Sequence, residues 1–202
     1  MHPAAVVFDV GNVLYRWHPR YLYETLIDDS VELDRVCAIV MSDQWHWSLD
    51  KGRIFADIAP GLIERFPRDA DYIRAWGTRF SETIDGPIAG MAEIVAALQA
   101  GNVPIYAITN FPGEFWTPFR AAESALFDRF SDIIVSGFEG IAKPDPAIFR
   151  LARERFRLGE GEGLFIDDVV GNVRAAEAEG FAGHHFHDAR TLRAALESLE
   201  IL

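Results

Sequence analysis

Five short segments rich in β-branched and aromatic residues constrain the fold of this chain most: residues 4–10, 103–109, 132–136, 163–167 and 183–187. Their length and composition predict β-strands. From the second segment onward, stretches with helical periodicity separate the predicted strands; Met91, Ile94, Val95 and Leu98, for example, precede the second. Near-continuous apolar strands that alternate with helices form parallel sheets whose two faces are both buried. The sequence therefore predicts an α/β fold with a parallel sheet covered by helices on both faces.

The connection between the first two predicted strands is longer than a crossover requires, since residues 11–87 precede the helix that leads to the second strand. Two apolar stripes with helical spacing lie within it: Phe55, Ile58, Leu62 and Phe66, then Ile73, Trp76, Phe80 and Ile84. Pro60 and Gly61 interrupt the first stripe, so we expect a kink or a break between two short helices there. Gly86 and Pro87 mark the hinge at which the chain returns to the core. We predict a helical subdomain over residues 16–86, inserted into a core of residues 1–15 and 87–202.

The formal net charge of −12 would repel a phosphate backbone, and the basic residues do not cluster, so we expect no nucleic-acid partner. The chain has no run of eighteen apolar residues, and its first residues do not resemble a signal peptide, which predicts a cytoplasmic protein with no membrane contact. Cys37 is the single cysteine, so no intrachain disulfide or cysteine-built zinc site can form. Its apolar neighbours Val36 and Val40 favour a buried small hydrophobe over a nucleophile.

Polar residues lie at or just beyond the carboxyl ends of the first four predicted strands. In chain order these are Asp9, Thr109, Asn110, Lys143 in the loop after the third strand, Asp167 and Asp168. Ligands of an open parallel sheet bind beyond the carboxyl ends of its strands, because the connecting loops and helix N-termini meet there. We therefore expect these side chains to form one site.

These residue types indicate a chemistry. Clustered carboxylates are unfavourable unless a divalent cation neutralises them, and an all-oxygen site suits Mg²⁺. A carboxylate beside a metal can attack phosphorus, while a hydroxyl, an amide and a lysine hold the phosphoryl oxygens. The pattern thus predicts phosphoryl transfer through an aspartyl-phosphate. The alternative is that Asp9 and Asp168 only cap the helices after their strands; the coincidence of four strand ends favours a chemical site.

Four segments carry a resemblance to a known family: residues 8–14 (Phe-Asp-Val-Gly-Asn-Val-Leu), 108–110 (Ile-Thr-Asn), 143–146 (Lys-Pro-Asp-Pro) and 165–172 (Phe-Ile-Asp-Asp-Val-Val-Gly-Asn). In this order they resemble the four motifs of the haloacid dehalogenase superfamily. The resemblance spans essentially the whole chain. It implies a Rossmann-like sheet, with residues 16–86 as the helical cap that subfamily I inserts between the first two motifs.

The resemblance also implies residue roles on the phosphate side of the site. Asp9 would be the nucleophile, and Thr109 and Asn110 would hold the phosphoryl oxygens. Lys143 would neutralise both the phosphate and Asp9. The implied substrate is a small phosphorylated metabolite.

On the metal side, the resemblance implies that Mg²⁺ is held by Asp9, by the backbone carbonyl of Gly11 and by Asp168. Asp167 would bind the metal directly or through water. Asn172 would orient Asp168 or a metal-bound water, or would simply open a helix.

Gly11 departs from the phosphatase pattern, in which a second Asp two positions after the nucleophile protonates the leaving group. Members that cleave carbon–halogen bonds also lack this acid, so a 2-haloacid dehalogenase that uses Asp9 without metal is one alternative. The pair Asp167 and Asp168 favours a Mg²⁺-dependent phosphatase, and some phosphatase-like members share the Asp-x-Gly-Asn opening. A non-catalytic phosphate-binding regulatory protein is a second alternative, which the complete set of motifs disfavours. His18 is either a substitute acid or the start of the first cap helix.

Aromatic residues precede Asp50 and Gly52 in the expected cap: Trp45, His46 and Trp47. They either contact the substrate, with Trp45 in the binding site, or form the core of a small helical bundle. Three aromatic residues after the second motif are candidates for the opposite wall of the pocket: Phe111, Phe115 and Trp116.

The histidines His184, His185 and His187 lie on the last predicted strand. Adjacent residues of a strand face opposite sides, so we expect no metal site there.

Overall fold

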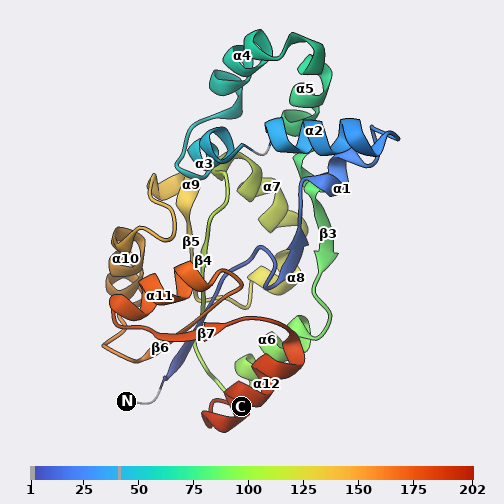
Figure 1. The fold of residues 1–202 in the computed structure, drawn as a ribbon. Helices are drawn as coiled ribbons and strands as arrows, with labels where there is room; N and C mark the ends of the chain where they lie inside the picture. Colours follow the sequence, from blue (N-terminus) through green and yellow to red (C-terminus); the bar gives the residue numbers. More distant parts are fainter. Residues whose placement is uncertain (1–2, 41) are drawn as a thin grey trace.

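The centre of the protein is a five-stranded parallel sheet (Figure 1), seen in a computed structural model that describes residues 3–40 and 42–202. The strands, in their order across the sheet, are β5 (Asp132–Val135), β4 (Ile105–Thr109), β1 (Ala5–Phe8), β6 (Gly163–Asp167) and β7 (Ala182–His185). Every neighbouring pair is parallel. The predicted α/β fold is confirmed. Strands β1 and β4 are shorter than the segments 4–10 and 103–109 that predicted them.

Helices cover both faces of the sheet because successive strand residues point to opposite sides. On one face, Val7 and Phe165 pack with the buried side chains of α10 (Pro146–Phe156) and α11 (Val170–Ala178). On the other, Val6 and Phe8 belong to a core that includes helices α6 (Met91–Ala100), α7 (Gly113–Ala122), α8 (Ser124–Phe127) and α12 (Ala189–Ser198). Figure 1 shows α10 and α11 on one side of the sheet and α6 and α12 on the other.

A separate antiparallel ribbon carries the chain away from the sheet and back again. It consists of β2 (Tyr15–Trp17) and β3 (Ile84–Pro87), with Tyr15 opposite Pro87 and Trp17 opposite Ile84. We call residues 18–83, which lie between the two strands, the helical segment. Its helices are α1 (Arg20–Tyr23), α2 (Ser30–Val40), α3 (Asp43–Asp50), α4 (Phe55–Arg65) and α5 (Ala70–Arg79), with 3₁₀ turns η1 (Pro67–Asp69) and η2 (Phe80–Thr83). In Figure 1 the segment lies beyond the end of the sheet opposite the N-terminus.

Two local predictions for the helical segment need correction. Helix α4 runs through Pro60 as one helix, so the expected break is absent, and a kink at Pro60 stays a prediction. Pro60 and Ala56, whose carbonyl loses a hydrogen bond to it, are both exposed, so water can satisfy that carbonyl while Ala59 and Leu62 stay buried. The second apolar stripe is not one helix either, because α5 ends at Arg79 and Ile84 belongs to the ribbon, where it pairs with Trp17.

The helical segment is fastened to the core at the end of α3. Helix α3 packs on α9 (Ser136–Glu139), which directly follows β5. The turn after α3 contains Gly52 with φ +89°, and a Cβ there would lie 2.9 Å from the carbonyl oxygen of Gly137. One turn later, the backbone N–H of Phe55 donates to Glu114 Oε1 at 2.6 Å. These contacts hold the last turn of α3 over the carboxyl end of the sheet.

The structure also bears on two expectations from composition. Cys37 is partly buried against the main core, where we expected full burial. Across residues 3–40 and 42–202, every helix is too short or too polar to cross a bilayer.

Candidate active site

A cavity of about 420 Å³ lies between the carboxyl ends of the central strands and helix α3. From the sheet side and its loops, it is lined by Asp9, Gly11, Asn12, Asn110, Lys143, Asp168 and Asn172. From the ribbon and the helical segment, it is lined by Trp17, His46, Trp47, Asp50, Phe80 and Ile84. The strand ends that the sequence singled out therefore meet at one cavity, as expected for an open parallel sheet.

Asp9 and Lys143 form a buried ion pair at the floor of the cavity. The Nζ atom of Lys143 lies 2.8 Å from Asp9 Oδ1 and 2.7 Å from Asp167 Oδ2. The backbone N–H of Val10 also donates to Asp9 Oδ1, at 2.6 Å. Burial raises the pKa of Asp9 to about 8; the charges of Asp167 and Asp168 add to the rise, and Lys143 opposes it. Asp9 thus sits where a further positive charge would stabilise its ionised form.

Asp167 is fully buried and its oxygens are occupied by hydrogen-bond donors. It accepts from Lys143 Nζ, from the backbone N–H of Val169 at 2.8 Å and, at both oxygens, from Asn172 Nδ2 at 3.0 and 3.1 Å. We expected Asn172 to orient Asp168 or a metal-bound water; its side chain instead orients Asp167, because the first turn of α11 lies directly beneath that carboxylate.

Asp168 is only partly buried and faces the cavity. Burial and the neighbouring charge of Asp167 raise its pKa, while Lys143 and a hydrogen bond from the Asn12 side chain oppose the rise. No role was predicted for Asn12 from the sequence. Its backbone is left-handed (φ 54°), a conformation that Asn adopts more readily than most residues.

The donor set fits Mg²⁺. One oxygen from each of Asp9, Asp167 and Asp168 lies within 4.8 Å of the others. Three carboxylates against one ammonium group leave excess negative charge, which a divalent cation balances. Because Asp167 already accepts several hydrogen bonds, Asp9 and Asp168 have the oxygens that remain available to a cation.

The residues expected at the phosphate differ in how they are held. Thr109 is buried, and its Oγ1 has no hydrogen-bond partner among the residues that the structure describes. The side chain of Asn110 is already engaged: Nδ2 donates to the Lys143 carbonyl at 2.9 Å, and Oδ1 accepts from the Lys143 N–H at 2.8 Å. Asn110 therefore fixes the Lys143 backbone. The second N–H of its amide is not used by these bonds, so the expected contact with phosphate stays a prediction.

Helix α3 presents a different face to the cavity from the one we expected. Trp45, expected at the substrate, is buried in the helical segment, with its ring 5.4 Å from that of Trp76. His46, Trp47 and Asp50 line the cavity instead. The 3.6-residue period explains this arrangement, since a helix that buries Trp45 and Leu49 on one side turns His46 and Asp50 to another.

Asp50, for which no role was predicted from the sequence, is a further acidic residue of the cavity. It is buried at the cavity wall, and its Oδ1 has no hydrogen-bond partner within residues 3–40 and 42–202. Its Oδ2 lies 3.7 Å from His46 Nε2. Burial raises the pKa of Asp50 to about 7, and Lys143 opposes that rise.

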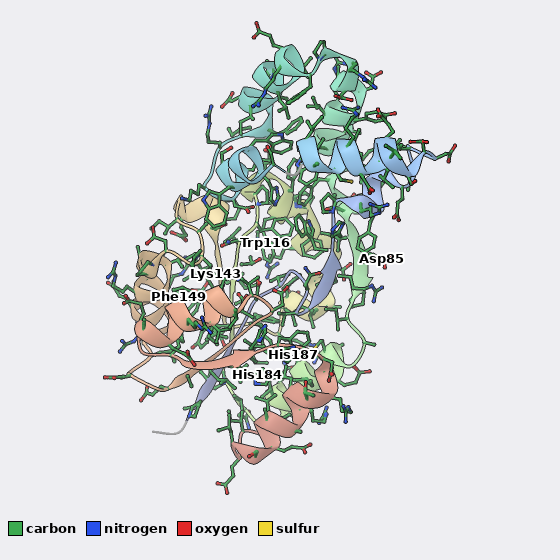
Figure 2. The ribbon with its side chains drawn as sticks, viewed as in Figure 1. Asp85, Trp116, Lys143, Phe149, His184 and His187 are labelled. Atoms are coloured by element: carbon green, nitrogen blue, oxygen red, sulfur yellow. The ribbon has the colours of Figure 1, made fainter. Side chains whose placement is uncertain are left out.

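The three aromatic residues after β4 do not form one wall. Phe111 lines the cavity, while Phe115 stacks on Phe80 at 4.3 Å and faces a neighbouring groove. Trp116 is buried beneath them against Phe111. Figure 2 shows Trp116 between the helical segment and Lys143.

The remaining histidines of the part of the chain that the structure describes lie outside the cavity lining. His18 is exposed, and its Nδ1 accepts the backbone N–H of Arg20 at 3.0 Å, a bond that fits the predicted role of opening α1. His185 Nε2 lies 2.9 Å from the Asp168 carbonyl oxygen. Figure 2 shows His184 and His187 toward α6 and α12, whereas Lys143 lies toward α10 and α11.

Comparisons with known proteins agree with this arrangement. A family model described as haloacid dehalogenase-like hydrolase matches residues 3–180. Sesquiterpene phosphatase astK of Aspergillus oryzae is 27% identical over 191 residues, which cover 92% of this chain and 90% of that protein. The HAD family enzyme bt-2542 of Bacteroides thetaiotaomicron, solved in complex with magnesium and inorganic phosphate, has a TM-score of 0.68 at 17% identity, over 92% of this chain and 95% of that one.

The fold alone does not separate phosphatases from dehalogenases. The L-2-haloacid dehalogenase from Xanthobacter autotrophicus has a TM-score of 0.66 at 16% identity, over 97% of this chain and 83% of that one. The family, in contrast, is settled by the match of its model, which extends over most of the sequence from the first strand to the end of α11. This chain belongs to the haloacid dehalogenase-like hydrolase family.

Proposed function

We propose that this protein is a Mg²⁺-dependent phosphatase that hydrolyses a small phosphate monoester through an aspartyl-phosphate on Asp9. The observation that carries the proposal is the cluster of Asp9, Lys143, Asp167 and Asp168 at the floor of one cavity. A buried carboxylate held by a lysine beside a second, available carboxylate has the parts that a metal-assisted nucleophile needs.

The residues divide the reaction as follows. A carboxylate oxygen of Asp9 attacks phosphorus, the bond to the ester oxygen breaks, and the alcohol leaves; water then hydrolyses the aspartyl-phosphate and regenerates Asp9. Lys143 and the Thr109 hydroxyl stabilise the phosphoryl oxygens as their charge redistributes. Mg²⁺, held by Asp9, Asp168 and the Gly11 carbonyl, would neutralise charge on the phosphoryl group and keep Asp9 ionised.

The walls of the cavity favour an ester whose organic group is apolar. Above the carboxylates, the lining includes Trp17, Trp47, Phe80, Ile84, Phe111 and Phe119. A neighbouring groove of about 380 Å³ shares Tyr15, Phe80, Ile84 and Phe119 with the cavity, so a longer chain has room to continue into it. Aromatic and aliphatic walls suit hydrocarbon or aryl groups. An isoprenoid or aryl monophosphate is the substrate class that fits these walls. The relative from Aspergillus oryzae is named as a sesquiterpene phosphatase, which supports the isoprenoid class.

We further propose that residues 16–86 act as a cap on a core of residues 1–15 and 87–202. The ribbon supports these limits, because Tyr15 and Pro87 pair where the chain leaves and re-enters the core. The cap would supply His46, Trp47 and Asp50 to the cavity and exclude water from it.

Turnover assays test the proposal. Phosphate release would be measured from an aryl phosphate, an isoprenoid monophosphate and phosphoglycolate, each with Mg²⁺ and with excess chelator, alongside halide release from 2-haloacids. We expect metal-dependent hydrolysis that favours the two apolar esters. Halide release that persists in chelator would establish a dehalogenase, and phosphate binding without turnover would establish a regulatory protein.

A further inference from the structure

The carboxyl group of Asp50 is buried at the cavity without the partners that usually accompany such burial. The residue is 4% exposed, and Oδ1 has no hydrogen-bond partner among the described residues. His46 Nε2 lies 3.7 Å from Oδ2, a distance that allows an ion pair when His46 is protonated but is longer than a hydrogen bond. A buried polar atom left without a partner lowers stability, and in a cavity wall it is positioned to bond a molecule that enters.

The position of Asp50 is fixed by the contacts that fasten α3 to the core. Gly52, two residues later, packs against the Gly137 carbonyl, and the Phe55 N–H donates to Glu114. Asp50 therefore lines the same cavity as Asp9 and Lys143, from the helical segment and not from the sheet, without any rearrangement of that segment.

The proposed reaction lacks an acid on the core side. Gly11 has no side chain, and His18 lies outside the cavity lining. Among the titratable groups that line the cavity, Asp9 is the nucleophile, Asp168 is a metal ligand and Lys143 is committed to its ion pairs. On the facing wall the candidates are Asp50 and His46, since Tyr15 donates its hydroxyl to Glu123 at 2.8 Å.

We propose that Asp50 protonates the leaving alcohol, in place of the acid that is missing at Gly11. This inference rests on the proposed phosphatase function. As the Asp9 oxygen bonds to phosphorus, the electron pair of the breaking P–O bond goes to the ester oxygen, which takes the proton from the Asp50 carboxyl group. The Asp50 carboxylate then accepts a proton from the water that attacks the aspartyl-phosphate, so the cycle ends with Asp50 protonated and inorganic phosphate released.

The electrostatic surroundings of Asp50 agree with this role. Burial raises its pKa to about 7, against the opposing charge of Lys143, so a substantial fraction carries a proton near neutrality. The other titratable groups around the cavity are Asp9, Asp168, His46 and Tyr15. A general acid is most useful when the leaving group is a poor one, which gives the proposal a specific signature.

The test compares leaving groups of graded pKa, from nitrophenols to simple alcohols, with Mg²⁺ present. For Asp50→Asn we expect kcat to fall about 10²-fold or more on alkyl phosphates and less than about tenfold on nitrophenyl phosphate, because only the former needs the proton. Asp57→Asn, an exposed aspartate of the same helical segment, is the matched control and should change neither. Circular dichroism checks that both variants are folded.

Adding Gly11→Asp to Asp50→Asn provides a rescue that a structural role of Asp50 would not produce. A Cβ at Gly11 has room, since the nearest atom outside its chain neighbours is Trp17 Cβ at 4.0 Å. We expect the double variant to regain alkyl phosphate turnover. In Gly11→Asp alone, the ratio of alkyl to nitrophenyl phosphate turnover should stay near the wild-type ratio, because the acid is already present. A large rise of that ratio would overturn the proposal, and this test does not require Asp50→Asn to fold.

Other outcomes separate the two proposals. A loss in Asp50→Asn that is equal for all leaving groups, or no loss, overturns the role of Asp50 and leaves the phosphatase function standing. Selective loss of alkyl turnover in His46→Gln but not in Asp50→Asn assigns the proton to His46 instead. If the wild-type protein hydrolyses no phosphate ester, both proposals fail.

Discussion

The two sides of the cavity are built differently. On the sheet side, the polar groups are braced by one another: Asp167 accepts from Lys143, Val169 and Asn172, and Asn110 holds the Lys143 backbone from both directions. On the helical side, Asp50 Oδ1 and the indole nitrogens of Trp45 and Trp76 are buried without hydrogen-bond partners in the described part of the chain. The carboxylates and the lysine of the sheet side are thus positioned by bonds to one another, and Thr109 Oγ1 is the atom there that lacks a partner among the described residues. On the helical side, Asp50 lines the cavity, so its Oδ1 can gain a partner from a ligand that enters.

The largest effect should come from Asp9→Asn on the sheet side. The amide is isosteric but neither attacks phosphorus nor carries charge for Mg²⁺, so we expect turnover to fall by about 10⁴-fold or more. The melting temperature should not fall, because burial destabilises the ionised form of Asp9 by more than Lys143 stabilises it, and Lys143 keeps its pair with Asp167. Turnover and thermal melts measure both, and normal metal-dependent activity would show that Asp9 is not the nucleophile.

Substitutions at Asp168 and Asp167 should have different effects, the first on metal binding and the second on stability. Asp168→Asn should raise the Mg²⁺ concentration needed for half-maximal activity by about 10- to 100-fold, since its carboxylate faces the cavity. Asp167→Asn should instead lower the free energy of unfolding by about 3 kcal/mol, because it breaks a fully buried pair with Lys143. Metal titrations and denaturant melts of both variants decide this. Equal or reversed metal effects would assign the direct ligand to Asp167.

The pH dependence of turnover should reveal the protonation of Asp50 on the helical side. Because the Asp50 pKa is raised to about 7 and the protonated form is the donor, alkyl phosphate turnover should fall by about tenfold per pH unit above that value. Nitrophenyl phosphate should show little of this decline, and Asp50→Asn should abolish it. Since His46, Lys143, Asp9 and Asp168 line the same cavity, a decline that survives in Asp50→Asn would belong to one of them.

The smallest effect should come from the turn after α3. Gly52→Ala places a Cβ 2.9 Å from the Gly137 oxygen on a backbone with φ +89°, and should cost about 1–3 kcal/mol of stability while raising KM a few-fold. Gly61→Ala, on exposed α4 with open space around it, is the control and should stabilise slightly. If Gly52→Ala changed neither quantity, the turn would not be what positions Asp50.

The sequence predicted the sheet side better than the helical side for a physical reason. Apolar strands and the residues after them report directly on a parallel sheet, because such strands must be buried and their carboxyl ends share one edge. Asp9, Lys143 and Asp168 were placed together on that basis. The orientation of α3 depends instead on a tertiary contact between Gly52 and Gly137, which has no local periodic signal, so Trp45 was expected where Asp50 lies.

The ribbon of β2 and β3 has a consequence for how such a protein can change over generations. Because Tyr15 and Pro87 are opposite each other, the chain leaves the core and re-enters it at adjacent positions, and the whole helical segment lies between them. An insert of another length or shape can be exchanged there without altering the spacing between β1 and β4, whose register is set by pairs such as Val6 with Ile105. The groups that perform the bond cleavage and the surfaces that select the molecule to be cleaved can therefore be inherited, or redesigned, separately.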